Sequence, residues 1–168
     1  HVNFTDVKTN SLEVHWDVVN SEIPDSPVSY RVTRNGFGLD PVVFNVTENK
    51  LIESSLAANT TYSYLVSAIQ NINGEEFATR PSPEKSATTL AAVPTQTVFS
   101  NVLSNQMTIS WNPNTNAPDT KYSVQVDTGG PVKTFIVTAP SYNLTRFPNS
   151  FTPLAANTLY NIQVAAIG

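Results

Sequence analysis

A seven-residue segment occurs twice in this chain and constrains its fold more than any other feature. Residues 56–62 have the sequence LAANTTY, and residues 154–160, 98 positions later, have the sequence LAANTLY. Each copy leads into an alternation of apolar and polar residues, which is typical of a strand with one buried face. The sequence therefore predicts one domain of about 90 residues present in two copies.

The same period-two alternation recurs in both halves, and no helical period occurs. The Asn35-Gly36 pair predicts a hairpin turn at the end of the third strand. Pro81 and Pro83 predict that the seventh strand lies at a sheet edge, because proline cannot donate to the ladder. Strands are expected around residues 2–7, 12–16, 30–34, 42–46, 51–56, 62–69 and 77–88, and around 99–102, 107–111, 122–126, 132–137, 142–144 and 160–167.

The expected domains are residues 1–89 and 94–168, joined by a short linker at 90–93. A short linker that ends in proline predicts two units placed end to end with restricted swing. The sequence stops directly after the sixth strand of the second unit, so residues 160–167 are expected to present an unpaired apolar edge. Two explanations stay open: the protein continues beyond Gly168, or another segment or chain completes the sheet by donating a strand.

Aromatic residues at fixed places in these strands point to a known family. Trp16 and Trp111 lie in the second strand of each unit, Tyr30 and Tyr122 lie in the third, and a Leu-x-x-x-Thr-x-Tyr pattern enters the sixth. The chain thereby resembles two tandem fibronectin type III domains. The family usually has proline two residues after the leucine, where this chain has alanine. The resemblance implies core positions at Trp16, Tyr30, Leu56, Tyr62, Trp111, Tyr122, Leu154 and Tyr160.

The resemblance also implies the architecture. Each unit would be an immunoglobulin-like β-sandwich, so the chain would be all-β, with the last strand of the second unit missing from this sequence. Each unit would carry a tyrosine corner, in which the tyrosine hydroxyl bonds back to the preceding backbone. No Arg-Gly-Asp tripeptide, which one branch of the family uses for integrin recognition, is present.

Composition argues against several classes of partner. The net charge is −4, and the nine Lys and Arg residues are scattered, whereas nucleic-acid binding requires clustered cations. Binding to an anionic membrane is disfavoured for the same reason. No apolar run approaches the roughly 20 residues that cross a bilayer. The chain has no cysteine, which excludes disulfides, zinc–thiolate sites and thiol catalysis.

The ionisable residues give no catalytic pattern. His1 and His15 are predicted to be surface residues without a carboxylate or nucleophile partner. Two acidic pairs, expected in loops, lack the dense ligand spacing of a calcium site: Glu22/Asp25 and Glu75/Glu76. No glycine-rich phosphate loop, nucleophile–base order or metal motif occurs. We therefore expect no enzyme activity, no catalytic, cofactor-binding or metal residue, and no cofactor.

Four Asn-x-Ser/Thr sequons are possible N-glycosylation sites, at Asn3, Asn45, Asn59 and Asn143. The abundance of Asn, Ser and Thr predicts about as many sequons by chance, so the count itself is no evidence. Their positions are more informative. Three alternate with apolar strand residues and should face solvent, and Asn59 lies in the turn before the tyrosine. All four could carry a glycan without disturbing the core.

The sequence favours an extracellular or cell-surface role. The first hypothesis is a structural or adhesion module pair, a semi-rigid spacer or protein-binding surface in a cell-surface, matrix or filament glycoprotein, whose partners are other proteins through adhesion or self-assembly. The second is a non-catalytic accessory module of a secreted carbohydrate-active enzyme or a phage tail protein. The third is a receptor ectodomain, which the lack of cysteines weakens.

Overall fold

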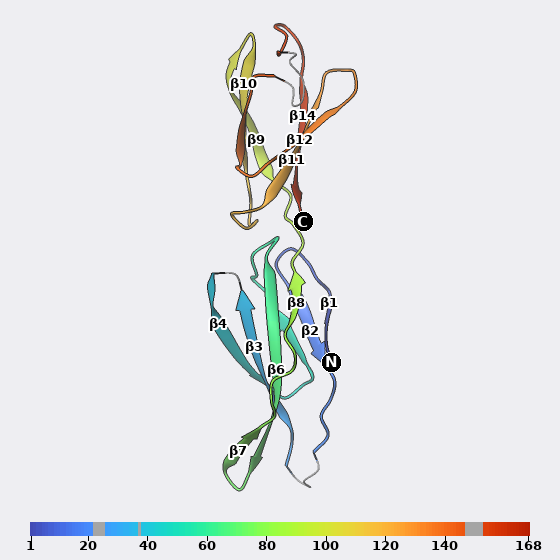
Figure 1. The fold of residues 1–168 in the computed structure, drawn as a ribbon, viewed down its shortest axis with the longest axis vertical. Coiled ribbons are helices and arrows are strands. Elements are labelled where there is room, and N and C mark those ends of the chain that lie inside the picture. The colour runs from blue at the N-terminus through green and yellow to red at the C-terminus, as the bar shows by residue number, and fades with distance from the viewer. Residues whose placement is uncertain (22–25, 37, 147–152) are drawn as a thin grey trace. The chain divides into compact units, whose positions relative to one another are not determined.

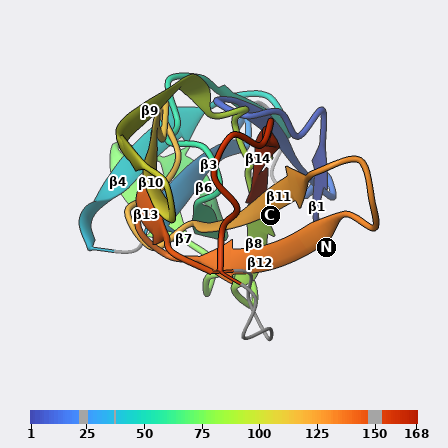
Figure 2. The ribbon, with the colours of Figure 1, turned by 90° about the horizontal axis from the view of Figure 1, so that it is seen from above.

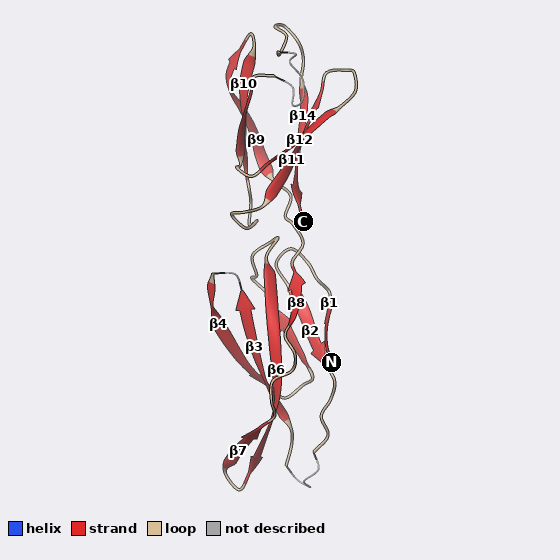
Figure 3. Ribbon diagram, in the orientation of Figure 1, coloured by secondary structure: helices blue, strands red, loops and turns tan. Residues whose placement is uncertain are grey.

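The computed structural model describes residues 1–21, 26–36, 38–146 and 153–168 of the chain. Within these residues it contains fourteen strands and no helix (Figures 1 and 3). The chain divides into two compact units, His1–Leu90 and Ala91–Gly168. The boundary between Leu90 and Ala91 lies within residues 90–93, the segment that the sequence predicts as the linker. In the part of the chain described, no helix is long and apolar enough to span a membrane.

Unit 1 is a sandwich of two antiparallel sheets. The first sheet has the order β1-β2-β5, formed by Val2–Thr5, Leu12–Trp16 and Lys50–Glu53. The second has the order β4-β3-β6, and two short strands, β7 and β8, both pair with the outer edge of β6. These strands are β3 (Ser29–Gly36), β4 (Leu39–Val46), β6 (Thr61–Ile72), β7 (Glu75–Ala78) and β8 (Lys85–Thr88).

Unit 2 repeats this arrangement with six strands. One sheet has the order β13-β10-β9, and the other has the order β12-β11-β14. In Figure 2, β9 and β10 lie across from β11 and β14. The strands are β9 (Thr95–Leu103), β10 (Gln106–Asn112), β11 (Lys121–Asp127), β12 (Lys133–Val137), β13 (Ser141–Leu144) and β14 (Asn161–Ile167).

A tryptophan packs on a tyrosine at the same place in each core. The Trp16 and Tyr30 ring centroids are 5.4 Å apart, and those of Trp111 and Tyr122 are 5.3 Å apart, both at an interplanar angle of 64°. This is an edge-to-face arrangement, which aromatic pairs prefer. Tyr160 is half-buried, and the other seven expected core residues are buried: Trp16, Tyr30, Leu56, Tyr62, Trp111, Tyr122 and Leu154.

The repeated seven-residue segment forms a tyrosine corner in both units, as the resemblance implies. The Tyr62 hydroxyl accepts a 2.9 Å hydrogen bond from the Ala57 amide, and the Tyr160 hydroxyl accepts a 2.7 Å bond from the Ala155 amide. Each corner contains an asparagine between the bonded alanine and tyrosine, and these residues, Asn59 and Asn157, have φ of +50° and +52°. Asparagine is one of the few non-glycine residues that adopt this left-handed conformation readily.

Two predictions for the chain turns need adjusting. The third strand ends at Asn35-Gly36 as expected, but both residues are still part of β3, and Gly36 pairs with Leu39 across the hairpin. The expected strand at 77–88 is two strands, β7 and β8, separated by the segment that contains Pro81 and Pro83. Between the two prolines, the Ser82 amide donates to the Val66 carbonyl at 2.8 Å. The edge location predicted for this segment is confirmed.

A polar network joins the two sheets of unit 1. Arg34 on β3 donates to one oxygen of the Glu53 carboxylate on β5 at 2.7 Å, and the Tyr64 hydroxyl on β6 donates to the other at 2.6 Å. Glu53 is buried, and the Arg34 guanidinium also lies 5.4 Å from the Tyr62 ring centroid. Burial and the hydrogen bond to Glu53 raise the pKa of Tyr64 far above its ordinary range.

Unit 2 has apolar residues at the equivalent places. The pairing of β2 with β5 and of β10 with β13 makes Leu144 the counterpart of Glu53. The pairing of β3 with β6 and of β11 with β14 makes Val126 and Ile162 the counterparts of Arg34 and Tyr64. Leu144 and Val126 are buried. One position in the sandwich is therefore filled by a hydrogen-bonded ion pair in one unit and by aliphatic side chains in the other.

Replacing Trp16 with alanine should destabilise unit 1 without altering its surface. Truncating a core aromatic residue costs about 3–5 kcal/mol through lost burial and the cavity it leaves. Val43→Ala on the exposed face of β4 is the matched control and should change the free energy of unfolding little. Calorimetric melting of the whole chain measures both variants, and an unchanged transition for Trp16→Ala would contradict the core assignment.

The effect of substitutions in the polar network on the free energy of unfolding should depend on how many of its residues are replaced together. Glu53→Leu alone leaves Arg34 and the Tyr64 hydroxyl without their acceptor, and breaking a buried pair in this way costs about 3–5 kcal/mol. The triple variant Arg34→Val, Glu53→Leu, Tyr64→Ile reproduces the side chains of unit 2 and should recover most of that loss. Denaturant unfolding compares the two. A triple variant less stable than Glu53→Leu would show that the network itself stabilises unit 1.

Candidate functional site

The histidine on β2 has neighbours that the sequence analysis did not predict. His15 Nε2 lies 3.1 Å from a Glu13 carboxylate oxygen and 2.9 Å from the Thr5 hydroxyl. Glu13 precedes it by two residues on the same strand face, which is the signal that was missed. Both contacts use one ring nitrogen, whereas a hydroxyl–imidazole–carboxylate relay requires the two different nitrogens. The trio therefore has the residues but not the geometry of a nucleophile-activating site.

The acidic residues do not form a metal site in the described residues. No group of three or more His, Cys, Asp or Glu side chains that could hold a metal ion occurs there. Glu75 and Glu76 lie on β7 rather than in a loop, and Glu76 accepts two hydrogen bonds from Arg31, at 2.8 and 3.0 Å. Glu22 and Asp25 lie outside the described residues.

The four sequons differ in their accessibility. Asn3, Asn45 and Asn143 are exposed on β1, β4 and β13. Asn59 is half-buried in the corner turn, where its amide donates to the Leu90 carbonyl at 3.1 Å. The three strand sites can accept a bulky modification directly, and the corner site is more restricted.

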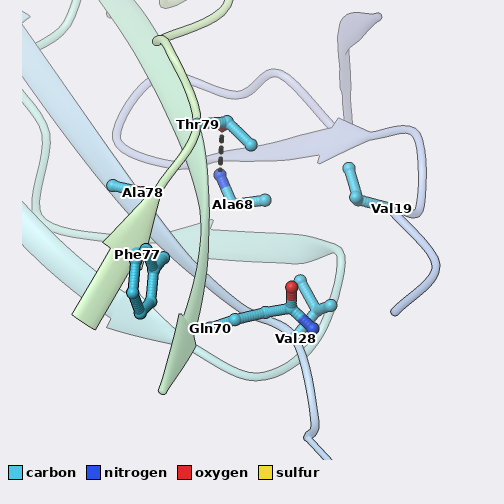
Figure 4. A pocket seen from close by; sticks show the side chains of 7 residues that line it. All are labelled: Val19, Val28, Ala68, Gln70, Phe77, Ala78 and Thr79. Atoms are coloured by element: carbon cyan, nitrogen blue, oxygen red, sulfur yellow. Dashed lines mark hydrogen bonds between the residues drawn. The ribbon is translucent and has the colours of Figure 1, made fainter. Parts of the chain in front are cut away.

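A small apolar hollow lies on unit 1 beside β6 and β7. Its volume is about 180 Å³. That is below the roughly 300 Å³ at which pockets for small-molecule ligands begin. Figure 4 shows the hydrogen bond from the Ala68 amide to the Thr79 hydroxyl at its border, which measures 3.0 Å. The hollow is lined by Val19, Val28, Ala68, Gln70, Phe77, Ala78 and Thr79.

Unit 2 has a larger groove between the start of its first sheet and its tyrosine corner. Its volume is about 480 Å³, and its lining consists of Val102, Leu103, Met107 and the segment 154–160. The neighbouring strand β9 carries four large apolar side chains that are 48–63% exposed: Val98, Phe99, Val102 and Leu103. Phe99 and Val102 lie in a strand, as their alternation predicts, but the groove is not predicted by the sequence pattern.

Strand β14 borders this groove and lies at the edge of its sheet. It pairs with β11 along its length, from Asn161↔Asp127 to Ile167↔Lys121. Within the described residues, no strand pairs with its other edge. Its inward side chains, Ile162, Val164 and Ala166, are only half-buried. Among the described residues, β14 is thus an edge strand of its sheet, and its start lies next to the groove.

Comparison with known proteins identifies the fold. Residues 92–168 match the family model of the fibronectin type III domain. A segment of two fibronectin type III domains from chicken tenascin matches with a TM-score of 0.65 at 19% sequence identity, over 99% of this chain and 89% of that chain. No curated protein matches the sequence. Residues 92–168 thus match the fibronectin type III family, and the chain as a whole has the fold of two tandem fibronectin type III domains, with the corner segment repeated in both units.

Proposed function

We propose that the chain is a non-catalytic extracellular module pair, a semi-rigid spacer that also presents a protein-binding surface in an adhesion, matrix or filament protein. The observation that carries this proposal is the likeness to two consecutive domains of tenascin over nearly the whole chain. A tandem array of small sandwiches separates and presents surfaces, and the short segment around Leu90–Ala91 leaves little free chain between the units.

The surface supports a binding role rather than a chemical one. The hollow beside β7 and the groove beside β14 are lined mainly by apolar side chains. Apolar concavities on an otherwise polar surface are typical of protein-interaction sites. The ionisable groups nearest to a catalytic pattern are occupied by local partners: Glu53 by Arg34 and Tyr64, and His15 by Glu13 and Thr5.

The spacer role predicts that the two units tumble together. Backbone ¹⁵N relaxation of the whole chain should give both units the same rotational correlation time. Replacing Ala91, Ala92 and Val93 with glycine should separate the two values, because glycine-rich linkers behave as flexible coils. Exchanging Ser54 for glycine, in a loop of unit 1, serves as the matched control. Independent tumbling of the unsubstituted chain would contradict a semi-rigid spacer.

The extracellular location predicts N-linked glycans on the protein from its natural source. Intact mass before and after glycosidase treatment should show glycans on at least two of the exposed sites, Asn3, Asn45 and Asn143. Replacing each of them with glutamine in that source should remove one glycan mass at a time. A mass equal to the bare polypeptide would instead favour the accessory modules of a secreted bacterial enzyme or a phage tail.

A further inference from the structure

The segment that joins the two units is hydrogen-bonded to unit 1 as far as Leu90. The Leu90 amide donates to the Lys8 carbonyl at 3.0 Å, and the Leu90 carbonyl accepts from the Asn59 amide at 3.1 Å. The preceding residue, Thr89, is buried, and its amide donates to the Thr60 carbonyl at 3.0 Å. Both main-chain polar groups of Leu90 therefore have partners in unit 1.

Unit 2 binds the same segment from Ala92 onward, and here the partner is a side chain. The Asn116 carboxamide oxygen accepts from the Ala92 amide at 2.7 Å, and the carboxamide nitrogen donates to the Ala92 carbonyl, also at 2.7 Å. A residue on a neighbouring antiparallel strand makes the same exchange of two bonds through its main chain. Asn116 lies in the loop between β10 and β11, 24 residues further along the chain.

Burial makes this contact specific. Asn116 is 9% exposed and Ala92 is 6% exposed. The carboxamide nitrogen also donates to the Pro113 carbonyl of its own loop at 2.7 Å. Buried polar groups are costly unless they are hydrogen-bonded, so the Asn116 side chain is held in one orientation by three acceptor and donor groups. These bonds offset the conformational entropy that is lost when a linker residue is fixed.

The residues that follow in the linker are restrained as well. The Asn114 side chain donates to the Val93 carbonyl at 3.2 Å. Pro94 restricts Val93 to extended backbone, and β9 begins directly after the proline. Ala91 is thus the one residue between the last residue bonded to unit 1 and the first bonded to unit 2.

The sandwich itself does not require this carboxamide. Five residues after the core tryptophan, where unit 2 has Asn116, unit 1 has Ser21. The Ser21 hydroxyl accepts a 2.7 Å bond from the Gln70 side chain, so the corresponding loop of unit 1 is bonded to the β6–β7 hairpin of its own unit. The loop of unit 2 differs in that it carries a side chain with the donor and the acceptor that match the main chain of the linker.

We propose that Asn116 is the positioning residue that makes the link between the two units stiff. By bonding both main-chain groups of Ala92, it makes that residue part of unit 2 and leaves Ala91 as the residue at which the chain can turn. One such residue gives a restricted hinge, whereas a run of unrestrained residues behaves as a flexible coil. This inference rests on the proposed spacer role and names the side chain on which its stiffness depends.

Replacing Asn116 with alanine should uncouple the motions of the two units. Backbone ¹⁵N relaxation, measured on the whole chain well below its melting temperature, should give one rotational correlation time for the unsubstituted chain. In Asn116→Ala both units should tumble faster and lose the common value, because Ala92 then joins Ala91 as an unrestrained linker residue. Asn105→Ala, the same substitution at an exposed residue in the turn between β9 and β10, is the matched control and should keep the common value.

The melting transition distinguishes this role from a purely structural one. If Asn116 served only to close its own loop through Pro113, its replacement would lower the melting temperature of unit 2 and leave the common tumbling unchanged. The proposal requires the tumbling to change at temperatures where the NMR spectrum shows unit 2 folded.

Amide hydrogen exchange of the unsubstituted chain tests the same bond without any variant. The Ala92 amide donates to Asn116, whereas the Ala91 amide has no hydrogen-bond acceptor among the described residues. Relative to their intrinsic rates, the Ala92 amide should therefore exchange at least about tenfold more slowly than the Ala91 amide.

Two results would overturn the inference: common tumbling of the two units in folded Asn116→Ala, and equal protection of the two amides. If Asn116→Ala unfolds unit 2, the exchange rates decide. Common tumbling in the variant leaves the spacer role intact and removes only the part assigned to Asn116. Independent tumbling of the unsubstituted chain would instead contradict the spacer role itself, so the two failures are distinguishable.

Discussion

Burial of one face of the sixth strand against the opposite sheet is the interaction on which each unit depends. In unit 1 this strand is β6, which has neighbours on both edges and an inward row led by the fully buried Tyr62 and Tyr64. The tyrosine corner fixes the position of Tyr62, the first inward residue of β6. Trp16, on the other sheet, belongs to the same core cluster as the inward residues of β6. In unit 2 the corner and Trp111 are in place, but β14 has a neighbour on one edge within the described residues. The inward side chains of β14 are correspondingly less buried than those of β6.

The two units also show that one core position can be filled in two chemically different ways. Arg34, Glu53 and Tyr64 satisfy one another's polar groups, whereas their counterparts in unit 2 are Val126, Leu144 and Ile162. A buried ion pair gives little net stability relative to aliphatic residues of similar volume, because desolvation offsets the attraction between the charges. The strand pairing that creates the position is the same in both units, so the fold requires a filled core there and does not require a particular chemistry.

The parts of this structure that were predictable from sequence are those set by local period and by a repeated motif. The alternation in Leu12–Trp16 and the Leu-x-x-x-Thr-x-Tyr pattern depend on a strand having two faces, which the sequence displays directly. The division of the seventh strand, the Glu13–His15 contact and the groove beside Leu103 were not predicted. These features depend on which residues lie opposite one another on neighbouring strands and on which backbone groups have a hydrogen-bond partner. Period alone does not contain that information.

Hydrogen exchange measures the central claim, that pairing on the outer edge of the sixth strand determines how firmly each sandwich is closed. Amides of the segment 61–68 should exchange only through opening of most of unit 1, since core strands open with free energies near that of global unfolding. Amides of the segment 161–167 should exchange much faster, through local opening of β14. Equal protection of the two segments in the same sample would contradict the account.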